Sequence, residues 1–191
     1  TTLFRSSQFD APDDLDTPPK GLVTEDLWIL SEFDAMMERV EDSWSRIDIY
    51  TAAQALKGFG TGVFPSHWLE LSKSRIYDGN QSAVWTLHRV VRDLLSAISP
   101  ICPFFSHYLS TTLYGSSAVD VRSFPRLPAI VDDEEAAALR ALTPIISEFN
   151  SAVWKSKKDA ELSLKSPISG IVVPSELSEL KDSLVRMHSI E

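Results

Sequence analysis

Two short groups of residues combine positive charge with an aromatic ring. One lies near the middle of the chain and the other in its last third: Trp68 with Lys73 and Arg75, and Trp154 with Lys155, Lys157 and Lys158. Ammonium and guanidinium groups neutralise phosphates, and aromatic faces stack on unpaired bases. The combination therefore predicts contact with single-stranded RNA. The simpler interpretation is a solvated basic face beside a core aromatic, and spacing alone does not separate the two.

The net charge of −9 opposes binding to a polyanion, but the charge is unevenly distributed along the chain. Residues 1–47 contain 11 acidic and 4 basic residues, residues 48–131 contain 5 and 7, and residues 132–191 contain 11 and 7. The middle segment is thus slightly basic. Its lysines and arginines could meet RNA while the acidic outer segments keep the protein soluble.

Residues suited to metal binding or catalysis are sparse. The four histidines, at positions 67, 88, 107 and 188, lack the close spacing of a zinc site, and a single cysteine cannot form a thiolate cluster. No glycine-rich phosphate loop or nucleophile elbow is present. His67 and Glu70 could form an acid–base pair, although a surface ion pair is the commoner use of that spacing. We therefore expect neither a metal site nor a catalytic residue, and we expect Cys102 to be a small core residue.

The composition is that of an ordinary globular chain, with 43% hydrophobic and 24% charged residues. No segment approaches the roughly 20 consecutive apolar residues that span a bilayer, and the N-terminus lacks the pattern of a signal peptide. These features predict a cytoplasmic protein without membrane contact. The chain starts at Thr1 rather than at a methionine, which suggests a piece of a longer protein.

Apolar residues recur every three or four positions in four stretches of residues 24–115. These stretches predict helices at 24–47, 48–75, 81–99 and 103–115. Pro65 should kink the second helix, and Gly115 should end the fourth. Short turns between such helices favour an antiparallel bundle. Residues 1–23, rich in Asp and Pro, are expected to run over its surface as a lead-in.

Two prolines interrupt any helical period in residues 116–132, which we interpret as a linker. The remaining residues, 133–191, predict a smaller unit. It should contain a long helix with Pro144 inside it or breaking it, a short strand at 168–173 and a final helix from Ser175. The expected fold class is therefore mainly α, an antiparallel helix bundle followed by a small α/β extension.

Four motifs follow one another along the bundle. They are Asp26, Trp28, Ile29, Leu30 and Ser31; Trp68, Leu69, Glu70, Lys73, Arg75, Ile76 and Tyr77; Pro100, Ile101, Pro103, Phe104 and Phe105; and Ala118 to Val121 followed by Phe124 and Pro125. This ordered set resembles the anticodon-binding domain of class I aminoacyl-tRNA synthetases over about residues 24–127. Residues 150–158 and 163–165 resemble the segment after the bundle in valine-specific members, particularly the archaeal-like form. Isoleucine-specific members are the alternative.

The sequence also departs from the family pattern. Pro65 and Ser66 stand where Cys or Asp is usual before the aromatic pair, and His107 and Ser110 replace the usual Glu and Trp after Pro-Phe. The family helix with an Asn-x-x-Arg-Phe motif would precede residue 1. The catalytic signatures His-Ile-Gly-His and Lys-Met-Ser-Lys-Ser are absent, so we expect no amino-acid activation by this chain alone.

The resemblance implies recognition of the anticodon stem and loop of a tRNA, specifically valine tRNA, by a monomer joined to a catalytic domain in the same polypeptide. The full-length enzyme would use ATP with Mg²⁺, whereas this chain is expected to need no cofactor and to bind no DNA. The residues expected to contact RNA are Trp28, Lys73, Arg75, Lys155, Lys157 and Lys158. One rival hypothesis is a helical module that binds a protein through an apolar groove. Another is a metal-free enzyme built around His67 and Glu70.

Overall fold

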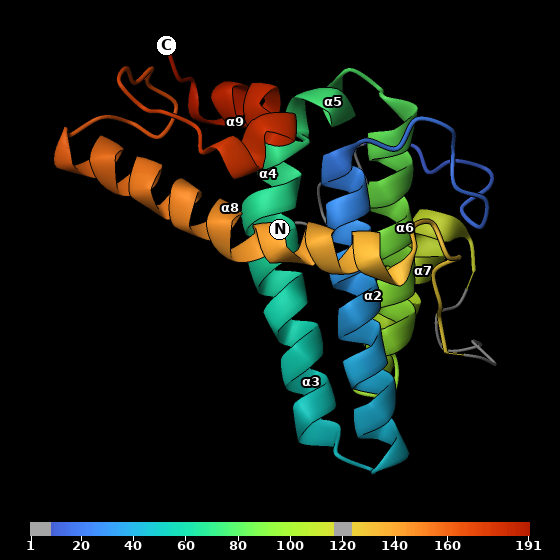
Figure 1. The fold of residues 1–191 in the computed structure, drawn as a ribbon. Helices are drawn as coiled ribbons and strands as arrows, with labels where there is room; N and C mark the ends of the chain where they lie inside the picture. Colours follow the sequence, from blue (N-terminus) through green and yellow to red (C-terminus); the bar gives the residue numbers. More distant parts are fainter. Residues whose placement is uncertain (1–8, 117–123) are drawn as a thin grey trace.

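The computed structural model describes residues 9–116 and 124–191, and its regular structure is helical. Four helical segments form an antiparallel bundle, as the sequence predicts (Figure 1). Its elements are α2 (Thr24–Ser45), then α3 (Ile49–Gly58), η1 (Phe59–Trp68), α4 (Leu69–Leu71) and α5 (Lys73–Tyr77) as one long path, then α6 (Gln81–Ile98) and α7 (Pro103–Tyr114). Helix α2 packs against α3, α6 and the later helix α8, which makes it the centre of the fold.

Helix α2 is held in the bundle by its apolar face, which includes the fully buried Trp28 and Val40. The helix ends earlier than its apolar pattern predicts. Ile47 was expected in the pattern, but it lies in the turn with a φ of 58° and is 81% exposed. The next helix starts directly afterwards, because the Asp48 carboxylate accepts a hydrogen bond of 3.0 Å from the Thr51 amide.

The second helical path accommodates Pro65 inside a π-helix, Phe59–Trp68, and continues to Leu71. The sequence predicts a kink at this proline. The structure has a wider helical turn there, spread over ten residues. The wider turn aligns aromatic rings one above another. Phe59 stacks on Phe64 with ring centroids 5.7 Å apart, and Phe64 stacks on Trp68 at 5.3 Å.

Helices α6 and α7 begin and end where the sequence predicts. The Asn80 side chain caps α6 by accepting from the Ala83 amide, and Gly115 ends α7 with a φ of 66°. The expectation for Cys102 was wrong, because this residue precedes the first turn of α7 and is exposed. One face of α7 is also exposed, with Phe104 at 90% and Tyr108 at 67%.

The C-terminal third begins with the long helix α8 (Asp133–Asp159), which crosses the bundle without breaking at Pro144 (Figure 1). After it, η3 (Ser175–Leu180) and α9 (Lys181–His188) form the predicted final helix, with a 3-10 first turn. The expected strand at 168–173 was wrong in the described chain. Only one bridge forms, between Ile168 and Ile190, because the segment has no neighbouring strand to pair with.

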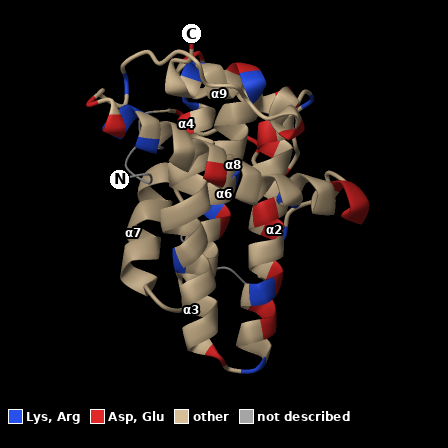
Figure 2. Ribbon diagram, turned by 60° about the vertical axis from the view of Figure 1, so that its left-hand side comes forward, with Lys and Arg blue, Asp and Glu red and all other residues tan. Residues whose placement is uncertain are grey.

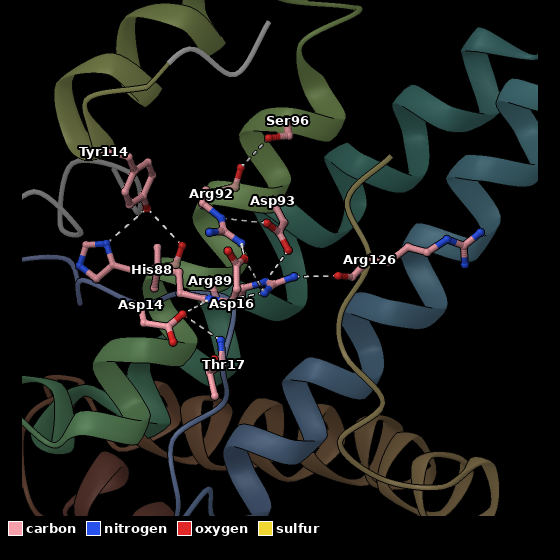
Figure 3. A network of polar contacts seen from close by, with 11 residues as sticks. Asp14, Asp16, Thr17, His88, Arg89, Arg92, Asp93, Ser96, Tyr114 and Arg126 are labelled. Carbon is pink, nitrogen blue, oxygen red and sulfur yellow. Dashed lines mark hydrogen bonds and ion pairs between the residues drawn. The ribbon is translucent and has the colours of Figure 1, made fainter. Parts of the chain in front are cut away.

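Two irregular segments, residues 9–17 and 124–131, are fixed to the bundle by the buried Arg89 (Figure 3). Its guanidinium bonds the Asp93 carboxylate at 2.6 Å, the Leu15 carbonyl at 2.9 Å and the Arg126 carbonyl at 2.7 Å. The described part of the expected lead-in therefore lies on the surface of the bundle. Residues 118–121, which supplied a motif, lie outside the described residues.

Candidate nucleic-acid interface

A cleft of about 630 Å³ lies between the α4–α5 region, the end of α8 and the C-terminal segment. We call it the basic cleft, and its polar and aromatic lining consists of Glu70, Lys73, Ser74, Trp154, Lys165, Arg186 and Ser189. Three cations thus face one carboxylate, although the chain as a whole is acidic. In Figure 2, charged residues gather along α2 and at the end of the molecule that carries α9, whereas α7 has none.

Lys73, one of the predicted RNA contacts, lines the basic cleft. Its ammonium lies 3.0 Å from a carboxylate oxygen of Glu70, and both side chains remain more than a third exposed. An ion pair this exposed contributes at most about 1 kcal/mol. Lys73 can therefore exchange this partner for a phosphate at little cost.

Trp154 also lines the cleft, and its orientation is set by two histidines. Its ring stacks on His67 with centroids 6.0 Å apart and meets His188 edge to face. Asn150 lies between the histidines, 2.9 Å from His67 Nδ1 and 2.7 Å from His188 Nε2. This polar chain joins η1, α8 and α9, and its two histidines fix the orientation of the indole.

Burial keeps these two histidines uncharged near neutral pH. It lowers the pKa of His67 below its ordinary value. Burial, together with the nearby charge of Lys157, lowers the pKa of His188 to about 4. His67 is engaged with Asn150 and Trp154, which gives it a structural role in place of the acid–base role considered with Glu70.

The structure places Lys157 in the interior, where it is fully buried. Its Nζ donates to the carbonyl oxygens of Leu164 at 2.7 Å, Ser166 at 2.8 Å and His188 at 2.7 Å. An ammonium has three donors, and here each one is used. Burial lowers the pKa of Lys157. The expectation of an RNA contact was wrong for this residue, because it fixes the C-terminal segment instead.

Arg75 and Trp28 are also structural. Arg75 donates to Glu25 at 2.7 Å and to the two oxygens of Asp26 at 2.6 and 3.0 Å, and both acids are buried. Trp28 is fully buried, and its indole N–H donates to Thr143 on α8 at 2.8 Å. Trp28 cannot reach RNA while the core is intact, so the expectation of RNA contact was wrong for it. The Arg75 side chain is 13% exposed and is engaged by both acids, so we propose a structural role for it in place of RNA contact.

The last two predicted contacts, Lys155 and Lys158, are exposed on the final turns of α8 but do not line the cleft. Sequence reasoning missed Lys165 and Arg186, which do. Both are isolated cations in sequence, and only the return of the chain over α4 brings them to Trp154 (Figure 1). No local sequence pattern predicts such an arrangement.

Residues 9–116 and 124–191 were also compared with the requirements of a metal site and of a membrane-spanning helix. Their histidine, cysteine, aspartate and glutamate side chains form no group of three placed to hold a metal ion. None of their helices combines the length and apolar character needed to cross a membrane.

Comparison with known proteins gives the family. The family described as the anticodon-binding domain of tRNA ligase matches residues 26–172. The chain belongs to this family. The match thus runs from the first turn of α2 to beyond the end of α8, whereas Arg186 and the rest of α9 lie outside it.

The chain is also similar to valine–tRNA ligases of archaea. It is 27% identical over 173 residues to the protein of Saccharolobus solfataricus, which covers 88% of this chain and 20% of that protein. It is 29% identical over 192 residues to that of Aeropyrum pernix, with 95% and 23% covered, and 30% identical over 181 residues to that of Methanothrix thermoacetophila, with 92% and 20% covered. The chain therefore spans about a fifth of the length of these relatives.

Proposed function

We propose that this anticodon-binding domain recognises the anticodon arm of valine tRNA as part of a valine–tRNA ligase. The observation that carries the proposal is the basic cleft, where three cations and Trp154 meet in a chain whose family is anticodon-binding. Lys155 and Lys158 extend the positive surface along α8. In the longer enzyme a catalytic portion would join valine to the tRNA with ATP and Mg²⁺, in the cytoplasm and as a monomer.

The chemistry of the cleft suits a tRNA loop better than a duplex. Loop bases are unstacked, so an aromatic face can stack on them and polar groups can bond their edges. Lysines and arginines neutralise the backbone phosphates at the same time. The acidic remainder of the chain repels phosphates elsewhere, which favours binding through this one region.

The first experiment is fluorescence-anisotropy binding of the chain to transcripts of valine, isoleucine and unrelated tRNAs at two salt concentrations. We expect the valine transcript to bind most tightly, to lose affinity when its anticodon is substituted, and to weaken steeply with salt. Tighter binding of isoleucine tRNA would instead indicate that the domain belongs to an isoleucine-specific enzyme. Absence of salt-sensitive binding to every transcript would refute anticodon-arm recognition by this chain.

A second candidate function rests on the exposed aromatic face of α7. Phe104 and Tyr108 are solvent-exposed, and an apolar groove of about 310 Å³ opens nearby, lined by Leu94, Ile98 and Ile101 among others. Such a surface suits a protein partner. Binding through it would change little with salt, so the same salt titration separates the two functions.

A further inference from the structure

The basic cleft is built from parts of the chain that lie far apart in the sequence. One wall, with Glu70 and Lys73, belongs to the bundle. A second wall, with Lys165 and Arg186, belongs to the C-terminal segment, and Trp154 of α8 also lines the cleft. The family match ends at residue 172, so Arg186 is outside it. The cleft thus exists only because the segment after α8 folds back over the bundle (Figure 1).

We propose that this cleft holds one unpaired nucleotide of the anticodon arm, with its base against Trp154 and its flanking phosphates on Lys165 and Arg186. The inference rests on the proposed function and makes the C-terminal segment a part of the RNA site. A volume of about 630 Å³ lies within the range of small-ligand sites. An indole held in place by His67 and His188 gives a stacking surface of fixed orientation.

The charges of the two walls orient the nucleotide. On the bundle wall, the Lys73 ammonium is paired with the Glu70 carboxylate, so these two charges offset each other until Lys73 exchanges this partner for a phosphate. Among the described residues, neither Lys165 nor Arg186 forms an ion pair with a carboxylate, so the C-terminal wall carries the net positive charge. Phosphates therefore belong on the C-terminal wall. The base edge then faces Ser74, whose hydroxyl can donate to ring nitrogens and accept from amino groups.

The buried Lys157 fixes the backbone of the C-terminal wall. This ammonium bonds the carbonyls of Leu164 and Ser166, the residues on either side of Lys165. It also bonds the carbonyl of His188, two residues after Arg186. The backbone that carries both cations is thus held in place before RNA arrives, and preorganisation reduces the entropy cost of binding. Lys157 acts here as a positioning residue.

The test compares two RNA probes and a matched set of variants. The probes are a single-stranded oligonucleotide with the anticodon-loop sequence of valine tRNA and the same strand annealed to its complement. The cleft variants are Trp154→Leu, Lys165→Ala and Arg186→Ala. Lys181→Ala is the control, because Lys181 is an exposed cation at the start of α9 outside the cleft lining. Thermal melts establish that each variant is folded.

We expect the single strand to bind more tightly than the duplex and Trp154→Leu to weaken it about tenfold or more. Lys165→Ala and Arg186→Ala should each lower the salt slope by about one phosphate contact, whereas Lys181→Ala should not. Trp154→Phe, which keeps an aromatic face, should restore most of the affinity. The inference is overturned if the wild type binds tRNA but the three cleft variants bind as it does, or if the duplex binds equally well. No tRNA binding by the wild type instead refutes the proposed function.

Discussion

Substitution of Arg75 tests most directly whether a cation of this region stabilises the fold or binds RNA. Its guanidinium holds two buried acids, Glu25 and Asp26, at 2.7 and 2.6 Å, and it also donates to Ser82 at 2.7 Å. Arg75→Ala leaves both carboxylates buried without a counter-ion. Breaking a buried pair in this way costs about 3–5 kcal/mol of unfolding free energy. For a chain of this size, each kcal/mol shifts the melting temperature by roughly 2–4 °C, so a fall of about 6–20 °C is expected.

The matched control is Lys73→Ala, two residues earlier on the same short helix. Its ion pair with Glu70 is exposed, so the loss should be no more than about 1 kcal/mol. Melting followed by circular dichroism measures stability, and anisotropy at a temperature where both variants are folded measures tRNA affinity. Arg75→Ala should lose stability and keep affinity, and Lys73→Ala should do the reverse. Equal stabilities, or a larger affinity loss in folded Arg75→Ala, would refute this assignment.

Three further predictions follow from other buried polar groups. Lys157→Met leaves three carbonyl acceptors without donors, so the free energy of unfolding should fall by at least about 2 kcal/mol and the segment after α8 should exchange amide hydrogens faster, as measured by mass spectrometry. His188 has a folded pKa of about 4 against 6.5 when unfolded, so the unfolded state binds more protons in this window and wild-type stability should fall as pH drops from 6.5 to 4. In denaturant titrations, His188→Gln should show a smaller fall over that window, and an unchanged slope would contradict the assignment. Arg89→Ala should lower the free energy of unfolding by at least about 2 kcal/mol and speed proteolytic cleavage within residues 9–17, because the buried Asp93 is left with the longer ion pair to Arg92, at 3.2 Å, and the Leu15 carbonyl loses its donor; cleavage at the wild-type rate would show that other contacts hold this segment.

The helices could be predicted because their signals are local. Apolar spacing, the Asn80 cap and Gly115 act within a few residues, and α6 and α7 formed where those signals place them. The burial of Lys157 was also accessible from sequence. It lies four residues after Val153 and so continues the buried face of α8. Its exposed neighbours Lys155 and Lys158 make the three lysines look like one charged group, although only Lys157 falls on the buried face.

The remaining errors concern contacts between distant parts of the chain. Arg75 meets acids about fifty positions earlier in sequence, and nothing in the spacing around Arg75 indicates that pairing. The apolar run around Val172 predicts a strand, but a strand also needs a neighbour, and Val172 is largely exposed. Lys165 and Arg186 became part of a site only through the return of the chain. Local patterns thus predict the elements better than the surfaces they create.

The π-helix at Phe59–Trp68 makes the length of this segment as important as its composition. Each residue of a regular helix turns the chain by about 100°. Deleting one residue here, with no change in helix type, would swing every later side chain of that path around the axis. Arg75 would leave Glu25 and Asp26, and Lys73 would leave the cleft. A chain with that deletion could keep almost every residue of its motifs and still lose both its buried ion pairs and its binding surface.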